Sequence, residues 1–334
     1  FEIKIFLTLY LNTEVCLKPI RLVNKNKERD KVHLVEWNLT RRCNFDCSYC
    51  DDTGNNPVGF HFKHDKISKH PSLETMIKII DGVESLGYYN IDWALSGGEP
   101  FTVPHIYEVL KYLRESAPYN ISLVTNGSVG LNRIIKCFEL LDKMIISFHY
   151  EFTQNRGDEY FNKIVEIDKL AKSLEKRFSA RFLLYPGQFE YFKKMYRRLK
   201  DAGVRVAEFR NIIPPPGWNK SYTKQEKNQI NWFRNNTGNY SQNLELTFDD
   251  NTCVTTYPDQ ITINGWNKFK GWSCTAGINQ THISPDGEVY RATCRAGGQL
   301  GSIIDPDFKP PIEPITCPFE TCIDYIDIST PKSA

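Results

Sequence analysis

The chain of 334 residues has no large excess of charge of either sign. Lysine and arginine together number 42 and aspartate and glutamate 40, which leaves a formal net charge of +2 at pH 7. Such a balance gives no overall field that would draw the protein onto nucleic acid. The basic pairs Lys193-Lys194 and Arg197-Arg198 fall in a helical pattern and are interpreted as a solvated helix face. We therefore expect no nucleic acid partner.

The sequence also lacks a hydrophobic run of the length that spans a bilayer. Residues 5–11 resemble the apolar part of a targeting signal, but they include Thr8 and Tyr10, and no small-residue cleavage site follows them. We interpret this segment as a strand. The expectation is a cytoplasmic protein with no membrane partner, in which residues 1–31 form one or two strands of unknown role.

No internal repeat or low-complexity tract is present, apart from a regular alternation of strand and helix patterns. Between about residues 33 and 236 this alternation is typical of βα units and a parallel sheet. Because six units are too few for a closed eightfold barrel, we predict an α/β fold with a partial (β/α)6 TIM-like barrel. The predicted strands are 32–40, 91–95, 121–124, 144–148, 180–184 and 204–210, and the predicted helices are 73–86, 106–116, 131–141, 160–176, 189–202 and 224–235.

The pattern changes to short strands and turns after about residue 236. The sequence Pro285-Asp286-Gly287 lies between the β-rich runs 281–283 and 289–290, and it predicts a β-hairpin. We therefore predict a boundary at this point, with the barrel over residues 32–236 and a small domain rich in β-hairpins over residues 237–334.

The ten cysteines gather mainly in two groups that lie far apart in the sequence, unlike the even scatter of a small secreted disulfide framework. Cys43, Cys47 and Cys50 form the first group, directly after the first predicted barrel strand. Three thiolates on one loop suit an iron–sulfur cluster, and a cubane held by three protein ligands keeps one iron open for chemistry. A structural zinc site is the alternative, although zinc normally takes four protein ligands, and no fourth Cys or His follows at the same close spacing.

The spacing CxxxCxxC, with Tyr49 before the last cysteine, resembles the signature of the radical S-adenosylmethionine (SAM) superfamily. The resemblance implies that SAM binds the open iron of a [4Fe–4S] cluster through its amino and carboxylate groups. It also implies reductive cleavage of SAM to a 5′-deoxyadenosyl radical that abstracts a hydrogen atom, with electrons from a flavodoxin- or ferredoxin-type reductant. By the same resemblance, Tyr49 lies against the adenine.

The run Ser96-Gly97-Gly98-Glu99-Pro100 follows the second predicted strand and resembles the GGEP element of that superfamily. The resemblance implies that this run receives the amino group of SAM. The residue chemistry agrees, because the two glycines permit close backbone approach and Glu99 supplies an acceptor for an ammonium group.

Polar residues follow the other predicted strands at the edge where parallel barrels carry their sites. By analogy with the superfamily, Ser147 is the candidate for the SAM ribose, and Arg210 or Arg181 for the SAM carboxylate, which a bidentate guanidinium would suit. Ordinary capping of strand ends explains each of these residues equally well when it is taken alone. The further candidates are Thr125 and Asn126 for the cofactor, and His149 and Glu151 for the substrate.

The second cysteine group comprises Cys274, Cys294, Cys317 and Cys322, enough thiols to fill every corner of a second cluster. The stretch from Cys274 through the predicted hairpin to Cys294 resembles the start of the SPASM and twitch auxiliary-cluster domains. The shorter twitch form, with one auxiliary [4Fe–4S] cluster, fits better, because only about half of the cysteines of a SPASM domain are present. A zinc ribbon is the alternative, since four thiolates on hairpins describe that site too.

Three functional hypotheses remain open at this point. The leading one is a radical SAM oxidoreductase that modifies a ribosomally made peptide or a small molecule such as a carbohydrate or aminocyclitol, with the auxiliary cluster accepting an electron. The second is a redox-neutral epimerase in which Cys253, outside both cysteine groups, returns a hydrogen atom, although such a thiol is more often simply buried. The third is a non-catalytic iron–sulfur or zinc protein that carries electrons or binds a partner.

Overall fold

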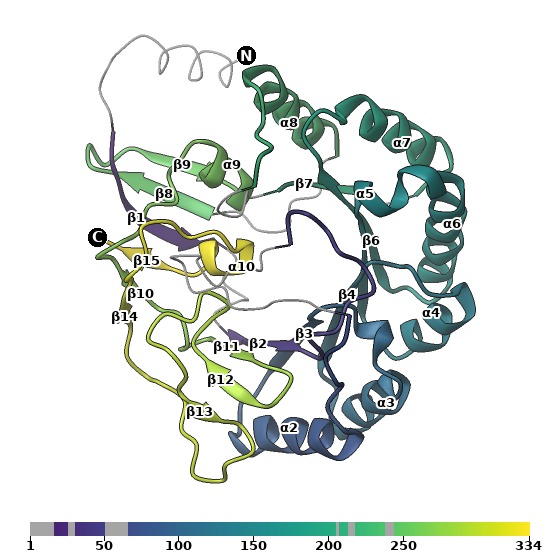
Figure 1. Cartoon of the computed structure of the whole chain (residues 1–334). Helices are drawn as coiled ribbons and strands as arrows, with labels where there is room; N and C mark the ends of the chain where they lie inside the picture. The colour runs from purple at the N-terminus through teal and green to yellow at the C-terminus, as the bar shows by residue number, and fades with distance from the viewer. Residues whose placement is uncertain (1–16, 26–30, 51–65, 205–206, 213–217, 238–243) are drawn as a thin grey trace.

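The computed structural model describes residues 17–25, 31–50, 66–204, 207–212, 218–237 and 244–334. Its larger sheet has nine strands in the order β13-β12-β11-β2-β3-β4-β5-β6-β7. Helices α2, α3, α4, α6, α7 and α8 lie along the outside of this curved sheet, and the C-terminal elements lie across from them, as Figure 1 shows. The arrangement is an open, partial barrel, which confirms the predicted fold class.

The six predicted strands and their helices are all present. Strand β6 begins earlier than predicted, because Arg177 pairs with Lys143 of the neighbouring strand. Helix α4 ends earlier, because the Leu140 amide donates to the Cys137 carbonyl in a tighter turn. The strands are β2 (His33–Asn38), β3 (Ile91–Ser96), β4 (Asn120–Thr125), β5 (Lys143–Phe148), β6 (Arg177–Leu184) and β7 (Ala207–Asn211), and the helices are α2 (Leu73–Ser85), α3 (Ile106–Ser116), α4 (Leu131–Phe138), α6 (Gly157–Ser173), α7 (Phe189–Asp201) and α8 (Lys224–Thr237).

The core lies between the sheet and its helices because alternate side chains of each strand point to one face. In β3 the buried residues Ile91, Trp93 and Leu95 belong to the same hydrophobic cluster as Ile80 of α2 and Leu110 of α3. The residues between them on β3 are only partly buried. The inner face of the sheet is therefore left for polar side chains, which suits a site inside the barrel.

The predicted hairpin after residue 280 is present, and it joins the barrel sheet. Strand β11 (Gln280–Ile283) pairs in parallel with β2, so that His282 lies opposite Glu36. Strands β12 (Glu288–Tyr290) and β13 (Gly301–Ser302) extend this edge in antiparallel fashion. The boundary at residue 236 stays a prediction, and the sheet runs across it.

A second sheet has the order β14-β10-β15-β1-β8-β9. The early strand β1 (Pro19–Asn24) lies in its interior, between β15 (Lys332–Ser333) and β8 (Leu244–Phe248). The predicted strand at residues 5–11 lies outside the described residues. Within the described ranges, no helix has the length and apolar character needed to cross a membrane. The other elements of this sheet are β9 (Cys253–Thr256), β10 (Ser273–Cys274) and β14 (Ile315–Thr316), and the short helices nearby are α9 (Pro258–Ile263) and α10 (Tyr325–Ile328).

Gly82 in the middle of α2 allows the turn after β13 to pack directly on the helix. A Cβ atom at this position would lie 2.1 Å from the Ile303 carbonyl oxygen. We expect Gly82→Ala to lower the free energy of unfolding by about 1–3 kcal/mol, because overpacking outweighs the better helix propensity of alanine. Urea denaturation measures the change.

The matched control is Gly157→Ala at the start of α6. A Cβ atom there would meet its nearest atom, Tyr191 Oη, at 3.4 Å, an ordinary contact, and the backbone φ is −57°. This variant should unfold at the same urea concentration as the parent or slightly above it. Equal stability of the Gly82 and Gly157 variants would contradict the close helix–turn contact.

Candidate active site

The loop that carries the first cysteine group is fastened to the end of β3 by backbone hydrogen bonds. The amide of Gly98 donates to the Thr40 carbonyl and the amide of Glu99 to the Arg42 carbonyl, both at 2.8 Å. A Cβ atom on Gly98 would lie 2.2 Å from the Arg42 carbonyl oxygen, and one on Gly97, where φ is +123°, would lie 2.6 Å from the Thr40 carbonyl oxygen. The two glycines are therefore required by this contact between the two chain segments.

Within that loop, the three thiols lie in one short turn and are partly buried. The Cys50 amide donates to the Cys47 carbonyl at 2.9 Å, and the Phe45 amide lies 3.4 Å from Cys43 Sγ. Burial raises the pKa of both Cys43 and Cys47, so these thiols hold their protons at neutral pH until a metal replaces them. Among the described residues, no three His, Cys, Asp or Glu side chains are placed to hold a single metal ion. The three thiols of the loop therefore suit a larger iron–sulfur cluster better than one ion.

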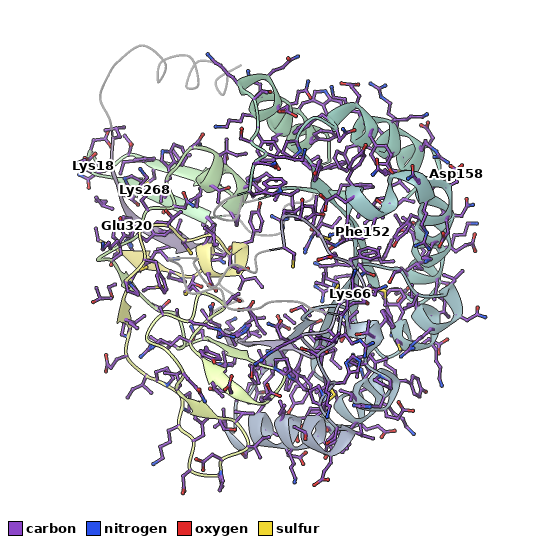
Figure 2. The ribbon with its side chains drawn as sticks, viewed as in Figure 1. Lys18, Lys66, Phe152, Asp158, Lys268 and Glu320 are labelled. Atoms are coloured by element: carbon purple, nitrogen blue, oxygen red, sulfur yellow. The ribbon has the colours of Figure 1, made fainter. Side chains whose placement is uncertain are left out.

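The short helix α5 (Tyr150–Thr153), which follows β5, packs against the cysteine loop. Phe45 stacks on Phe152 with ring centroids 4.4 Å apart. Figure 2 shows Phe152 on the inner side of the ring of helices, whereas Asp158, a few residues later, lies on the outside. The loop therefore rests on an aromatic side chain in the barrel interior.

Glu151, predicted to face the substrate, binds the cysteine loop. Its carboxylate accepts hydrogen bonds from the Ser48 amide at 2.7 Å, the Ser48 hydroxyl at 2.5 Å and the Tyr185 hydroxyl at 3.0 Å. Because Ser48 lies between Cys47 and Cys50, Glu151 fixes the backbone between two of the thiols. Its contact with a substrate stays a prediction.

His149 lies between the thiol of Cys47 and the ring of Tyr49. Its Nδ1 is 3.3 Å from Cys47 Sγ and 3.0 Å from the Tyr49 hydroxyl. Tyr49 in turn meets Tyr185 and Trp218 edge-on, with centroids 6.0 and 5.9 Å apart. Three aromatic rings thus pack together beside the cysteine loop. The contact of Tyr49 with adenine stays a prediction.

Glu99 is fully buried and joins the ends of β3 and β4. Oε1 accepts from the Thr125 hydroxyl at 2.7 Å and the Phe101 amide at 3.0 Å, while Oε2 accepts from the Asn126 amide at 2.7 Å. Burial raises the pKa of this carboxyl group, and the same donors act in the opposite direction. The Asn126 side chain also donates to Asn44 of the cysteine loop at 2.9 Å. The structure therefore brings these predicted residues together; their contact with SAM stays a prediction.

The predicted carboxylate ligands, Arg181 and Arg210, are both paired with acidic side chains. Arg181 donates to Glu208 at 3.1 and 3.2 Å, and Arg210 donates to Asp259 of α9 at 3.1 Å. Burial alone would raise the pKa of Glu208, but the two guanidinium groups lower it to about 2. Ser147 is buried directly opposite Arg181 in the sheet. Roles for these residues in SAM binding stay predictions.

The second cysteine group converges on one small cavity of about 20 Å³. Burial raises the pKa of Cys294, Cys317 and Cys322. Four thiols on one small pocket fit a fully protein-ligated metal centre. The pocket is lined by Phe269, Cys274, Ala276, Cys294, Ala296, Ile315, Cys317, Phe319, Cys322, Asp327 and Lys332.

Cys253 and Cys137 lie elsewhere. Cys253 is exposed on the edge strand β9, with its sulfur 3.5 Å from the Thr247 hydroxyl. Its role as a hydrogen-atom donor stays a prediction. Cys137 is buried in the core of α4, where burial raises its pKa to about 11, as expected for a packing residue.

A row of hydrogen-bonded polar side chains lies between the two cysteine sites, and sequence reasoning missed it. The Thr293 hydroxyl, next to Cys294 in sequence, lies 3.3 Å from Glu36 Oε1 and 3.4 Å from His282 Nδ1. His282 Nε2 lies 3.4 Å from the Asn38 amide nitrogen, and Ser96 donates to Asn38 at 2.8 Å. Burial lowers the pKa of His282 to about 3, so its imidazole is neutral. These side chains come together only because β11 pairs with β2.

The model of the Radical SAM superfamily matches residues 37–226, more than half of the chain. This chain is a member of the radical SAM superfamily. The family prediction from the cysteine spacing is therefore confirmed, and with it an enzyme that uses a [4Fe–4S] cluster and SAM. The match covers the partial barrel with the first cysteine group, and the second cysteine group lies beyond it.

Relatives resemble only part of the chain. The AdoMet-dependent heme synthase of Methanosarcina barkeri is 31% identical over 103 residues, which cover 31% of this chain and 26% of that protein. The chain thus spans about a quarter of that relative's length. Among solved structures, anSMEcpe with bound AdoMet is 19% identical with a TM-score of 0.54, covering 82% of this chain and 78% of the other. Streptococcus suis SuiB bound to S-adenosylmethionine is 12% identical with a TM-score of 0.55, covering 84% and 66%. These two likenesses support the fold.

Glu99→Gln tests whether the hydrogen bonds that the Glu99 carboxylate accepts stabilise the protein and its cysteine loop. The amide nitrogen of glutamine cannot accept a hydrogen bond, so it leaves one of the three donors around Glu99 facing another donor. We expect the free energy of unfolding to fall by about 1–3 kcal/mol, and the reconstituted protein to hold less iron at the first cysteine group. Urea denaturation and iron analysis measure the two effects.

The control is Glu74→Gln on the exposed start of α2, where the carboxylate pairs only with Lys78 at the surface. Its stability should match that of the parent, because water screens this exposed pair. A Glu99 variant as stable and as rich in iron as this control would show that the strand ends do not depend on the carboxylate.

Proposed function

We propose that this protein is an oxidoreductase of the radical SAM superfamily that holds two [4Fe–4S] clusters. The observation that carries the proposal is the difference between its two cysteine sites. One presents three thiols on a loop in the barrel, and the other presents four thiols around a closed pocket. Three ligands leave an iron open for SAM, and four ligands suit electron transfer.

When bound, the first cluster and SAM supply a 5′-deoxyadenosyl radical that removes a substrate hydrogen atom, and the second cluster supplies an acceptor for the remaining electron. The chain itself positions and shields this chemistry. Glu151 fixes the loop at Ser48, and Glu99 joins the strand ends beneath it. The rings of Tyr49, Tyr185 and Trp218 border the loop and reduce the access of water.

The proposed substrate is a peptide or a small molecule, reached through the open side of the barrel. The fold neighbour anSMEcpe has been solved with AdoMet and a Kp18Cys peptide, which supports a peptide for that protein and makes it a candidate class here. A flavodoxin- or ferredoxin-type protein is the proposed reductant. The epimerase hypothesis needs Cys253 near a substrate, and its position on an exposed edge strand gives that hypothesis no support.

Cys47→Ala and Cys317→Ala should have different effects on SAM cleavage, because each removes a ligand from a different cysteine group. We expect Cys47→Ala to abolish formation of 5′-deoxyadenosine from SAM under dithionite. Cys317→Ala should keep that cleavage, because the first cluster is intact. Each variant should lose about four irons per chain, the content of one cubane. Liquid chromatography of the nucleoside and iron analysis of anaerobically reconstituted protein give both readouts.

Cys253→Ser is the matched control, because its thiol is exposed and lies outside both groups. It should keep the iron content and the SAM cleavage of the parent. Zinc in place of iron at the second group, or full iron content in Cys317→Ala, would contradict the two-cluster proposal. Loss of SAM cleavage in Cys253→Ser would favour a role for this thiol at the site.

A further inference from the structure

A buried lysine, Lys332, lines the same pocket as the four cysteines of the second group. It is 5% exposed and lies on β15, directly opposite Cys274 in the pairing of β10 with β15. A lysine is rarely buried to this degree without a specific partner. Its place beside four thiols therefore needs a physical explanation.

The ammonium group of Lys332 is held by backbone oxygens. Nζ donates to the carbonyls of Asp327 and Thr330, both at 2.7 Å, and to that of Ile328 at 3.2 Å. These three bonds use all three N–H groups. Nζ also lies 4.8 Å from the centre of the Phe269 ring. These contacts hold the ammonium group at a fixed place beside the thiols.

Other charges around the pocket are few among the described residues that line it. Asp327 is the second ionisable group there besides the cysteines, and one of its oxygens accepts from the Cys294 amide at 2.7 Å. Among the described residues that line the pocket, Lys332 therefore carries the one cationic group beside the four thiols.

We propose that Lys332 is a fixed internal cation that raises the reduction potential of the auxiliary cluster. This inference rests on the proposed two-cluster function. A cubane bound by four thiolates becomes more negative when it gains an electron, so a cation in a dry pocket stabilises the reduced form. The chain thereby prepares its second site to accept an electron.

Packing alone does not explain a lysine at this position. A hydrocarbon side chain of similar length fills the same volume without the cost of removing an ammonium group from water. A role confined to binding the three carbonyls predicts that methionine lowers the stability of the protein and leaves the potential of the cluster unchanged. A role as a charge predicts that arginine replaces it and methionine does not.

The test uses the full chain with Cys43, Cys47 and Cys50 changed to alanine, so that only the auxiliary cluster is present. In this background we expect Lys332→Met and Lys332→Gln to lower the reduced fraction at a fixed potential at least tenfold. That change corresponds to a potential lower by 59 mV for one electron. Lys332→Arg should keep the potential of the parent. Potentiometric titration followed by electron paramagnetic resonance measures all three.

Lys270→Met is the matched control, because Lys270 is exposed and pairs with Glu320. Glu320 lies between Cys317 and Cys322 in the sequence. Removing this solvated charge should leave the potential unchanged. An unchanged potential in Lys332→Met and Lys332→Gln would overturn the inference. So would loss of the cluster in all three Lys332 variants, since arginine keeps the charge. Loss of the cluster in the methionine and glutamine variants alone would also overturn it, because the three carbonyls that Lys332 binds explain that loss without any effect on the potential.

Iron analysis of the alanine background separates this inference from the proposal on which it rests. A parent that binds about four irons confirms a cluster at the second group, and the potentials of the variants then decide the role of Lys332. A parent that binds zinc or no metal refutes the two-cluster function itself, whatever the variants do.

Discussion

The site depends above all on a buried carboxylate that fastens loops to the ends of neighbouring strands. Glu99 accepts three hydrogen bonds, two of which come from Thr125 and Asn126 at the end of β4. Its own backbone amide binds the Arg42 carbonyl just before the first cysteine. A single residue thus couples two strands and the cysteine loop. Removal from water makes each of these bonds costly to lose, so the loop has one arrangement relative to the sheet.

The barrel and the second cysteine pocket are connected through the sheet. Because β11 pairs with β2, residues from both parts of the chain share the inner face, and Thr293 places the pocket next to Glu36. Arg210 and Asp259 form a second connection, from β7 to α9. The two cysteine sites are therefore joined through paired strands and the contact of Thr293 with Glu36.

The sequence predicts those features that follow from local periodicity and close spacing. The alternation of apolar and polar residues gives the six strands and helices, and the grouping of Cys43, Cys47 and Cys50 with Gly97-Gly98-Glu99 gives the family. The pairing of β11 with β2 joins residues far apart in the chain, and no local pattern reveals it. For the same reason, the acidic partners of Arg181 and Arg210 and the buried position of Lys332 emerge only from the tertiary structure.

The interior place of β1 in the second sheet has a consequence for the order of folding. Arg21 pairs with Ser333, so one of the first described strands meets one of the last. Synthesis is slow compared with the formation of helices and hairpins, and the βα units can fold while the chain is still on the ribosome. The second sheet must wait until residue 333 has been made. The pocket of the second cysteine group is accordingly completed late in biogenesis, after the βα units of the barrel have formed.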